Sequence, residues 1–195
     1  EVMRGEETQI LGLSDLLQHD HGDGPHTICL PGTHSKWVTV QAGRITAFRT
    51  AMTGEVYAVL RQHSILGAGM AEPGKVAAGE SGTADDAAAF KTGLAGSGQP
   101  GGLLNHLFSV RTRGLFGELS PTQVTAYLSG LLIGHELHGL LGDVDATQGR
   151  TVHLIGNAAL TSRYRQALSW WGARSCVHDE ALVTRGLFML AATLV

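Results

Sequence analysis

The residues best suited to chemistry in this sequence form a short turn of small and polar side chains, Gly-Thr-His-Ser at residues 32–35, followed by Lys36. The turn lies between Thr27–Leu30 and Trp37–Val40, whose β-branched residues and flanking glycine and proline predict two antiparallel strands. A third β-rich run at residues 45–48 extends the pair to a meander. Small turn residues allow backbone N–H groups and hydroxyls to approach an anion closely. The alternative is an ordinary hairpin, because short glycine-containing turns are common.

Two adjacent carboxylates, Glu6 and Glu7, begin a predicted helix over residues 6–18 whose apolar residues recur at helical spacing. A positioned carboxylate can act as a general base. Acidic residues at a helix start are also favoured by the helix dipole without any catalytic role. Adjacent helical residues point about 100° apart, so we expect only one of the two to face a cleft.

Histidines provide the other candidate chemistry, which is metal binding. His135 and His138 are three residues apart on a predicted helix, and His19 and His21 lie in a predicted loop with two aspartates. Neither pair is accompanied by a third ligand at a spacing typical of zinc sites. The sequence therefore predicts no metal site held by the protein alone.

Strands and helices alternate in the last part of the chain, after the candidate residues described above. Thr151–Ile155 is predicted to be a buried strand that ends in a Gly-Asn pair. A helix over residues 161–171, a strand over Arg174–Val177 and a helix from about residue 180 follow. This order predicts parallel strands joined by a crossover. With the meander, it indicates an α/β fold with a mixed sheet and flanking helices.

The middle of the chain is predicted to be helical. One helix is expected to begin near Thr53, and two more to span residues 85–94 and 103–110. Ser120 is the expected N-cap of a further helix, since proline and glutamine follow it at favourable positions. The glycine-rich residues 95–102 predict a flexible loop.

Composition argues against two classes of partner, nucleic acids and membranes. The 195-residue chain has a net charge of −3 and a pI near 6.4, so it lacks a basic footprint for nucleic acid. Its longest apolar runs, residues 128–134 and 186–195, are too short to span a bilayer. Cys29 and Cys176 lie in strand-like runs and are expected to be reduced thiols, which favours the cytoplasm. The chain begins without Met, and we expect it to be a piece of a longer protein.

The order of these elements resembles the second half of the fold shared by sugar kinases, actin and heat-shock-chaperone ATPases. The resemblance implies a ribonuclease-H-like second domain in which the turn between the first two strands faces the nucleotide phosphates. Gly5-Glu6-Glu7-Thr8-Gln9 resembles the Gly-Asp-Gln-Gln segment of carbohydrate kinases, whose acidic residue is the catalytic base. The first phosphate turn of these proteins, Asp-x-Gly-Thr, is absent from this sequence.

Five segments narrow the resemblance to the 2-dehydro-3-deoxygalactonokinase family across nearly the whole chain. In order, they are Met3–Gln9, Leu30–Val38, Met52–Glu55, Leu107–Arg111 and Tyr127–Gly134. Members of this family are longer, so their N-terminal part, with the first phosphate turn, is expected to precede Glu1. We therefore expect residues 1–24 to be the end of an N-terminal domain with an interdomain helix and linker. Residues 25–195 would be the C-terminal nucleotide-binding domain.

The resemblance implies an ATP-dependent kinase of galactonate catabolism that phosphorylates the 6-hydroxyl of 2-dehydro-3-deoxy-D-galactonate, with Mg²⁺ accompanying ATP. Arg4 is a candidate for the substrate carboxylate, because guanidinium pairs with carboxylates bidentately. The implied roles of the others are catalytic base for Glu6 or Glu7, phosphate binding for Gly32, Thr33, His34, Ser35 and Lys36, and adenine contact for Gly156 and Asn157. The chain alone is expected to be inactive, and a homodimer is among the expected assemblies.

Two other functions stay open from the sequence. One is a non-catalytic ATP-binding or sugar-acid-binding module of the same fold. The other is an actin-like or chaperone-like ATPase with a protein partner. The Gly-Glu-Glu segment, in the place of a sugar kinase's base, favours a kinase over the ATPase, whereas only an assay separates a kinase from the non-catalytic module.

Overall fold

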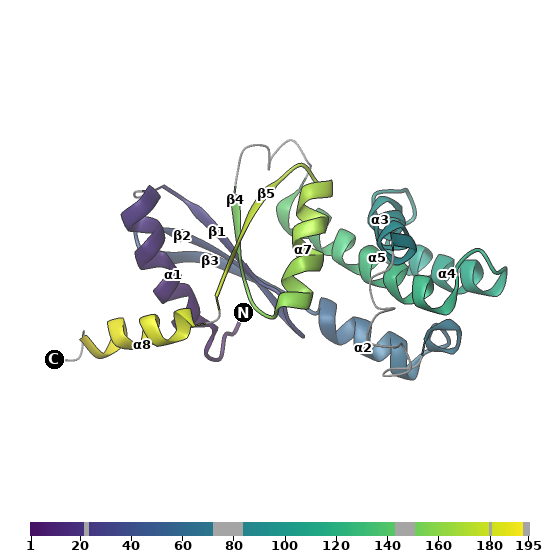
Figure 1. Ribbon diagram of the computed structural model, residues 1–195, viewed down its shortest axis with the longest axis horizontal. Coiled ribbons are helices and arrows are strands. Elements are labelled where there is room, and N and C mark those ends of the chain that lie inside the picture. Colours follow the sequence, from purple (N-terminus) through teal and green to yellow (C-terminus); the bar gives the residue numbers. More distant parts are fainter. Residues whose placement is uncertain (22–23, 72–83, 143–150, 180, 193–195) are drawn as a thin grey trace. The chain divides into compact units, whose positions relative to one another are not determined.

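The computed structural model describes residues 1–21, 24–71, 84–142, 151–179 and 181–192. The chain divides into two compact units. Residues 1–52 and 147–195 form an α/β unit, and residues 53–146 form a helical unit. Figure 1 labels the elements of both units along the chain.

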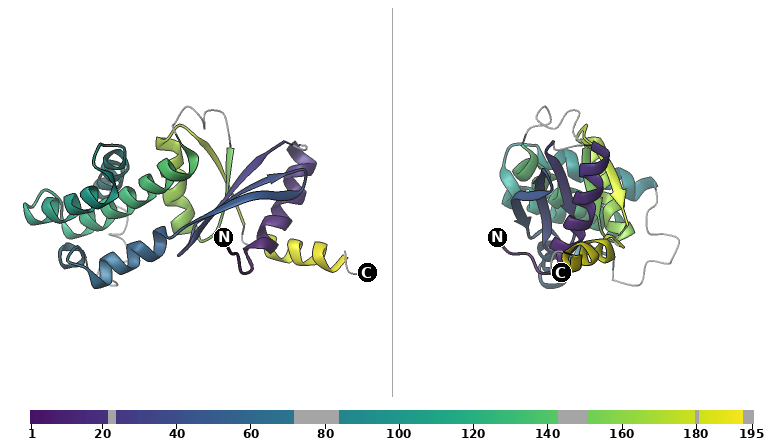
Figure 2. Two further views of the ribbon diagram at one scale, coloured as in Figure 1. Left: turned by 180° about the vertical axis from the view of Figure 1, so that it is seen from behind. Right: turned by 90° about the vertical axis from the view of Figure 1, so that its left-hand side faces the viewer.

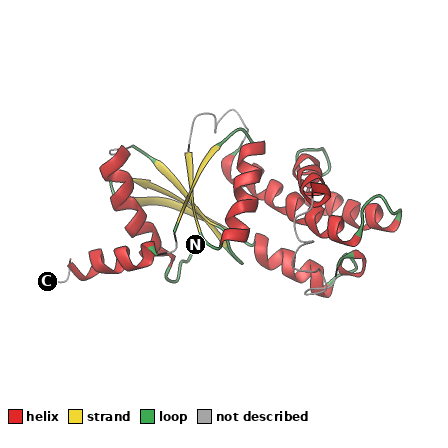
Figure 3. Ribbon diagram, in the orientation of Figure 1, coloured by secondary structure: helices red, strands yellow, loops and turns green. Residues whose placement is uncertain are grey.

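The α/β unit is built on a mixed sheet, whose strands are yellow in Figure 3. The sheet has five strands in the order β3-β2-β1-β4-β5. The strands are β1 His26–Leu30, β2 Ser35–Gln41, β3 Arg44–Ala51, β4 Thr151–Ile155 and β5 Arg174–His178. The first three form the predicted antiparallel meander, β4 runs parallel to β1, and β5 runs parallel to β4. The prediction of an α/β fold with a mixed sheet and flanking helices is therefore confirmed.

Three helices flank this sheet: α1 Glu6–His21, α7 Ala158–Trp170 and α8 Leu182–Ala192. Helices α1 and α7 lie on opposite faces of the sheet, as the front and back views show (Figures 1 and 2). On the second face, the Tyr164 ring of α7 lies against Trp37 of β2, with ring centroids 6.5 Å apart. The core on the α1 side consists of Ile10, Leu13, Leu17, Ile28, Leu30, Val38, Val40 and Ile155.

Helices α1 and α8 pack closely because each contributes a glycine where they cross. A Cβ added to Gly12 would overlap the backbone of Leu182, and one added to Gly186 would overlap the backbone of Thr8. An ion pair between Arg185 and Asp15 joins the same two helices. Helix α1, predicted to belong with an N-terminal domain, packs here as part of the α/β unit.

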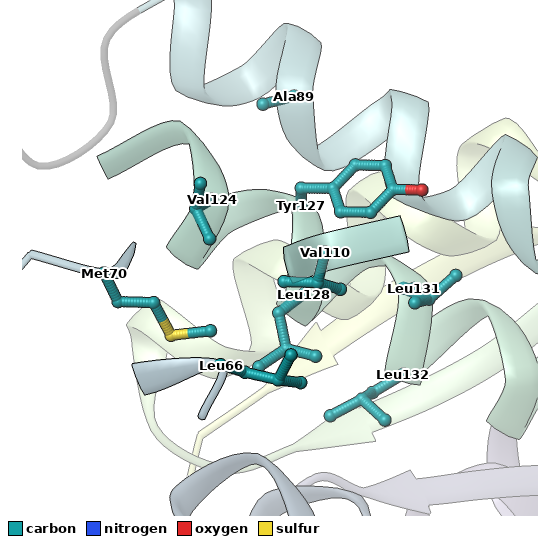
Figure 4. Packing of buried hydrophobic residues seen from close by; sticks show 9 residues of the cluster. All are labelled: Leu66, Met70, Ala89, Val110, Val124, Tyr127, Leu128, Leu131 and Leu132. Atoms are coloured by element: carbon teal, nitrogen blue, oxygen red, sulfur yellow. The ribbon is translucent and has the colours of Figure 1, made fainter. Parts of the chain in front are cut away.

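The helical unit contains α2 Thr53–His63, the 3₁₀ helix η1 Gly67–Gly69, α3 Ala84–Ser97, α4 Gly102–Leu115 and α5 Pro121–Leu141. Ser120 caps α5 as predicted. Its Oγ accepts a hydrogen bond from the Gln123 backbone N–H at 3.4 Å, and its own N–H donates to Gln123 Oε1 at 2.8 Å. The core of this unit, shown in Figure 4, contains Leu66, Met70, Ala89, Val110, Val124, Tyr127, Leu128, Leu131 and Leu132.

Two helices extend into segments that were predicted to be loops. Helix α1 continues to His21, although the sequence predicted a loop from residue 19. Helix α3 continues to Ser97, into the predicted flexible segment over residues 95–102. Helix ends depend on capping and tertiary contacts, which the spacing of apolar residues does not report.

Candidate functional site

An open pocket of about 760 Å³ lies at the carboxyl ends of the neighbouring parallel strands β1 and β4. Four segments of the α/β unit line it: the first turn of α1, the β1–β2 turn, the end of β4 and the first two turns of α7. Open α/β sheets usually bind ligands at the carboxyl ends of their parallel strands. We therefore take this pocket as the candidate functional site.

Glu6 supplies the acidic wall of the pocket, and Gln9 lies one helical turn further along α1. Glu6 is half-buried, and its Oε2 accepts a hydrogen bond from the Arg4 backbone N–H at 2.7 Å. Glu7 Oε2 accepts one from the Gly5 backbone N–H at 2.6 Å. Both carboxylates thus bond to the backbone just before α1, but only Glu6 is part of the pocket wall. The Arg4 side chain is exposed and lies outside that wall.

The β1–β2 turn contributes Gly32, Thr33 and His34 to the pocket. The side chains of Thr33 and His34 are exposed. A Cβ added to Gly32 would meet no heavy atom within 4 Å, so nothing in the described structure crowds its backbone. The turn is therefore open to a ligand that approaches the carboxyl end of β1.

Ser35 and Lys36, predicted to bind phosphate with the turn, lie outside the pocket wall. Both are the first residues of β2, and their exposed fractions are 0% and 5%. The Ser35 hydroxyl forms a hydrogen bond of 2.8 Å with the Tyr164 hydroxyl of α7. In this structure Ser35 thus links the base of the turn to α7 and does not line the pocket.

Gly156 marks a close approach between the end of β4 and the β1–β2 turn. Its φ is 150°, in a region that side-chain-bearing residues rarely adopt. A Cβ at this position would lie 3.5 Å from the Pro31 carbonyl oxygen. The contact brings the two chain segments to the same side of the pocket.

Asn157 is the N-cap of α7. Its Oδ1 accepts hydrogen bonds from the backbone N–H groups of Ala159 and Leu160, at 2.9 and 3.2 Å. This cap makes the helix begin at Ala158, three residues earlier than predicted. The positive end of the helix dipole consequently borders the pocket, where it favours an anion.

Arg163 and Gln9 line the pocket but were not identified from the sequence. Arg163 is half-buried on the second turn of α7, three residues after Leu160 and six after Asn157. Gln9 follows Glu6 by three residues on α1. Spacing of three along a helix places residues on one face, so this signal could have found both once the helix starts were known. Arg163 adds a permanent positive charge beside the helix N-terminus.

A second pocket of about 710 Å³ adjoins the first and shares Gly156 and Asn157 with it. It extends to the carboxyl end of β5, where His178 and Asp179 line it, and it includes Arg165 of α7. Burial lowers the pKa of His178, which favours the neutral imidazole. The ends of β4 and β5 thus border a second pocket with polar side chains, next to the candidate site.

In the structure, His135 pairs with His106, a histidine from another helix. His135 Nε2 lies 2.9 Å from His106 Nδ1, in the helical unit. Burial, followed by the charges of His106 and His138, lowers the pKa of His135. The other candidate pair was His19 and His21. The side chain of His21 and those of the loop aspartates lie outside the described part of the structure.

The fold and the pocket define an α/β protein with a candidate ligand site at the ends of its parallel strands. Comparison with known sequences is more specific. Residues 1–190 match the 2-keto-3-deoxy-galactonokinase family, and the chain belongs to that family.

Two curated relatives and one solved structure agree with this assignment. The probable 2-dehydro-3-deoxygalactonokinase DgoK1 of Rhizobium meliloti (strain 1021) is 40% identical over 185 residues, which are 93% of this chain and 56% of the relative. The 2-dehydro-3-deoxygalactonokinase of Escherichia coli (strain K12) is 38% identical over 172 residues, 88% of this chain and 52% of the relative. A crystal structure from Sinorhizobium meliloti, assigned as a 2-dehydro-3-deoxygalactonokinase, is 36% identical with a TM-score of 0.81. It matches 100% of this chain and 61% of its own.

The chain spans about half the length of the curated relatives it matches. Among the helices in the described part of the chain, none is long and apolar enough to cross a membrane.

Proposed function

We propose that the protein containing this chain is an ATP-dependent kinase that phosphorylates the 6-hydroxyl of 2-dehydro-3-deoxy-D-galactonate. Family membership and the names of the relatives support the reaction and the substrate. The structural observation that carries the proposal is that Glu6 lines the same pocket as the Gly32 turn and the N-terminus of α7. Phosphoryl transfer needs an acceptor-orienting base and phosphate-stabilising donors at one place, and this pocket offers both.

In the proposed reaction, Glu6 accepts the proton of the substrate 6-hydroxyl. The hydroxyl oxygen forms a bond to the γ-phosphorus as the bond from that phosphorus to the bridging oxygen of ADP breaks. Glu6 is favoured over Glu7 because only Glu6 faces the pocket. Arg4 is an exposed residue two positions before the start of α1, and it is the proposed partner of the substrate carboxylate.

The nucleotide is proposed to bind along the turn and the start of α7. Backbone N–H groups and side chains of Gly32, Thr33 and His34 would contact the phosphates, together with Arg163. Gly156 and Asn157 would border the adenine.

Ser35 and Lys36 would act from outside the pocket wall, Ser35 by holding the turn and Lys36 by its charge. Mg²⁺ would accompany ATP, with phosphate oxygens and water as its main ligands and few from the protein, and it would neutralise charge on the phosphates.

In the sheet order β3-β2-β1-β4-β5, strand β2 runs antiparallel to the other four strands. This arrangement supports a ribonuclease-H-like domain as the proposed fold. Residues 25–195 would form the nucleotide-binding domain, and residues 1–24, whose helix α1 packs on the sheet of that domain, would be the interdomain helix and linker at the end of an N-terminal domain. Because the relatives are longer, we propose that the 195-residue chain alone has little turnover. A homodimer and a cytoplasmic location complete the proposal, the latter in accord with two free cysteines.

A coupled ADP-release assay on the full-length protein tests the proposal. ADP release that requires both ATP and 2-dehydro-3-deoxy-D-galactonate is the expected result. Binding of ATP or the sugar acid without turnover would instead support the non-catalytic module. ATP hydrolysis at the same rate without any sugar acid would support the actin-like or chaperone-like ATPase.

A further inference from the structure

Three metal-ligating side chains meet on one face of the sheet at its β5 edge. They are His153 of β4 and Cys176 and His178 of β5. His153 and Cys176 are register neighbours in the parallel pair, and His178 follows Cys176 by two residues. Side chains at such positions point to the same face of a sheet. One ligand atom from each residue lies within 4.8 Å of the other two.

The two imidazoles are already arranged around a common point. His153 Nδ1 and His178 Nε2 face each other at 2.9 Å, and the rings are tilted by 36°. Only one proton can occupy the space between them, so at least one of the nitrogens presents a lone pair there. In a tetrahedral site with ordinary Zn–N bonds, two imidazole nitrogens lie about 3.3 Å apart. An outward shift of about 0.4 Å would therefore let a metal ion replace the shared proton.

The donor set selects a class of metal. Two imidazoles and a thiolate are typical ligands of zinc and similar borderline or soft ions, whereas Mg²⁺ and Ca²⁺ require oxygen ligands. The accessibility of the three donors increases outward: His153 is 5% exposed, His178 is half-buried and Cys176 is exposed. An ion can thus enter from solvent past the thiol, and water can occupy a fourth position.

The surroundings hold the innermost ligand in place. The His26 ring of β1 stands edge-on to the His153 ring, with centroids 5.9 Å apart. This ring contact limits how the His153 imidazole can turn. On the other side, β5 is the last strand of the sheet and pairs only with β4 among the described strands.

We propose that His153, Cys176 and His178 bind one zinc-class divalent cation, with water as the fourth ligand. The ion cross-links the edge strand β5 to β4. The site differs from the Mg²⁺–ATP site proposed above, because none of its three residues lines the first pocket and His178 borders the second one. The proposal does not depend on kinase activity.

Zinc titration of the metal-free protein, in competition with a chromogenic chelator, tests the site. The expected result is one equivalent of bound zinc that excess Mg²⁺ does not displace. The variants C176S and H178Q replace an exposed and a half-buried side chain, and each should weaken zinc binding by about tenfold or more. The matched control is H135Q, because His135 belongs to another histidine pair with the same 2.9 Å separation. It should bind zinc as the unmodified protein does.

Cobalt substitution distinguishes this site from adventitious binding by surface histidines. Bound Co²⁺ should show a thiolate-to-cobalt charge-transfer band that disappears in C176S and persists in H135Q. Zinc should also raise the thermal midpoint of the unmodified protein but not of C176S. Any one of three outcomes would overturn the proposal: no zinc binding, equal zinc affinity in C176S, or cobalt binding without the thiolate band.

Discussion

The hydroxyls of Ser35 and Tyr164 form a hydrogen bond of 2.8 Å that joins the first residue of β2 to the middle of α7. Both side chains are buried, with exposed fractions of 0% and 1%. The Gly32 backbone N–H also donates to the Ser35 oxygen, at 3.5 Å. The bond therefore connects the turn that lines the candidate site with the helix whose N-terminus lines it too.

Tyr164→Phe should destabilise the α/β unit by about 1 kcal/mol, because it deletes this buried hydrogen bond and keeps the ring. Urea denaturation followed by circular dichroism measures the effect. Tyr57→Phe is the control, since Tyr57 is only partly buried and lies in the helical unit. It should change stability by less than about 0.5 kcal/mol. A Tyr164→Phe protein with the original denaturation midpoint would show that the bond contributes nothing measurable.

Glu6→Gln should lower kcat in the full-length protein by about 10²–10⁴-fold, because an amide cannot accept the substrate proton. The amide oxygen can still accept the Arg4 backbone N–H, so the start of α1 should be preserved. Steady-state ADP release gives kcat, and calorimetric titration should give a nearly unchanged nucleotide Kd. Glu7→Gln is the matched control and should keep nearly normal turnover. Normal turnover in Glu6→Gln, with loss in Glu7→Gln, would move the base to Glu7.

Gly32→Val should weaken ATP binding without unfolding the protein. Nothing lies within 4 Å of a Cβ at this position, so the added side chain meets only a ligand that approaches the turn. Calorimetric titration of the full-length protein with a non-hydrolysable ATP analogue measures the affinity, and circular dichroism checks the fold. Gly139→Val is the control, because its Cβ also meets open space, on α5 of the helical unit. Equal affinity in the two variants would make the turn an ordinary hairpin.

Acid should destabilise the helical unit through His135. Its pKa is lowered by burial and then by the charges of His106 and His138. Between this lowered pKa and the unfolded value of about 6.5, the unfolded chain binds more protons than the folded one. Stability therefore falls as pH falls through that window, whereas above about pH 6.5 the ring is neutral in both states and contributes no pH dependence.

Urea midpoints measured from pH 7 downward should show this loss, and His135→Gln should flatten it. His63→Gln is the control, because His63 is an exposed histidine of the same unit. An unchanged pH slope in His135→Gln would assign the acid sensitivity to another group.

Local features of the sequence were enough to predict several elements. The strand over Thr151–Ile155 has the predicted bounds. A run of β-branched and apolar residues that ends at a glycine indicates a strand without any information from distant parts of the chain. The start of α5 was predicted for the same kind of reason, since a capping box is complete within four residues. The meander followed from three β-rich runs separated by short turns.

The candidate site could be predicted only in part. The resemblance pointed to Glu6, the turn after β1 and the Gly-Asn pair after β4, and the structure brings these into one pocket. Arg163 was missed because its place in the wall depends on where α7 begins, and Asn157 sets that start by a side-chain contact. Ser35 and Lys36 were grouped with the turn because they are adjacent in sequence, although β2 directs them into the interior.

The sequence by itself determined the elements and their order, because periodicity, turn residues and caps act within a few neighbouring positions. Only the tertiary structure decided how the meander joins the later strands, with β4 between β1 and β5. Pairing β4 with both β1 and β5 places Gly156 beside Pro31 and His153 beside Cys176, although 22 residues separate that histidine and cysteine. The Ser35–Tyr164 bond arises in the same way. Contacts of this kind depend on strand register and helix packing between distant segments, for which a local pattern carries no signal.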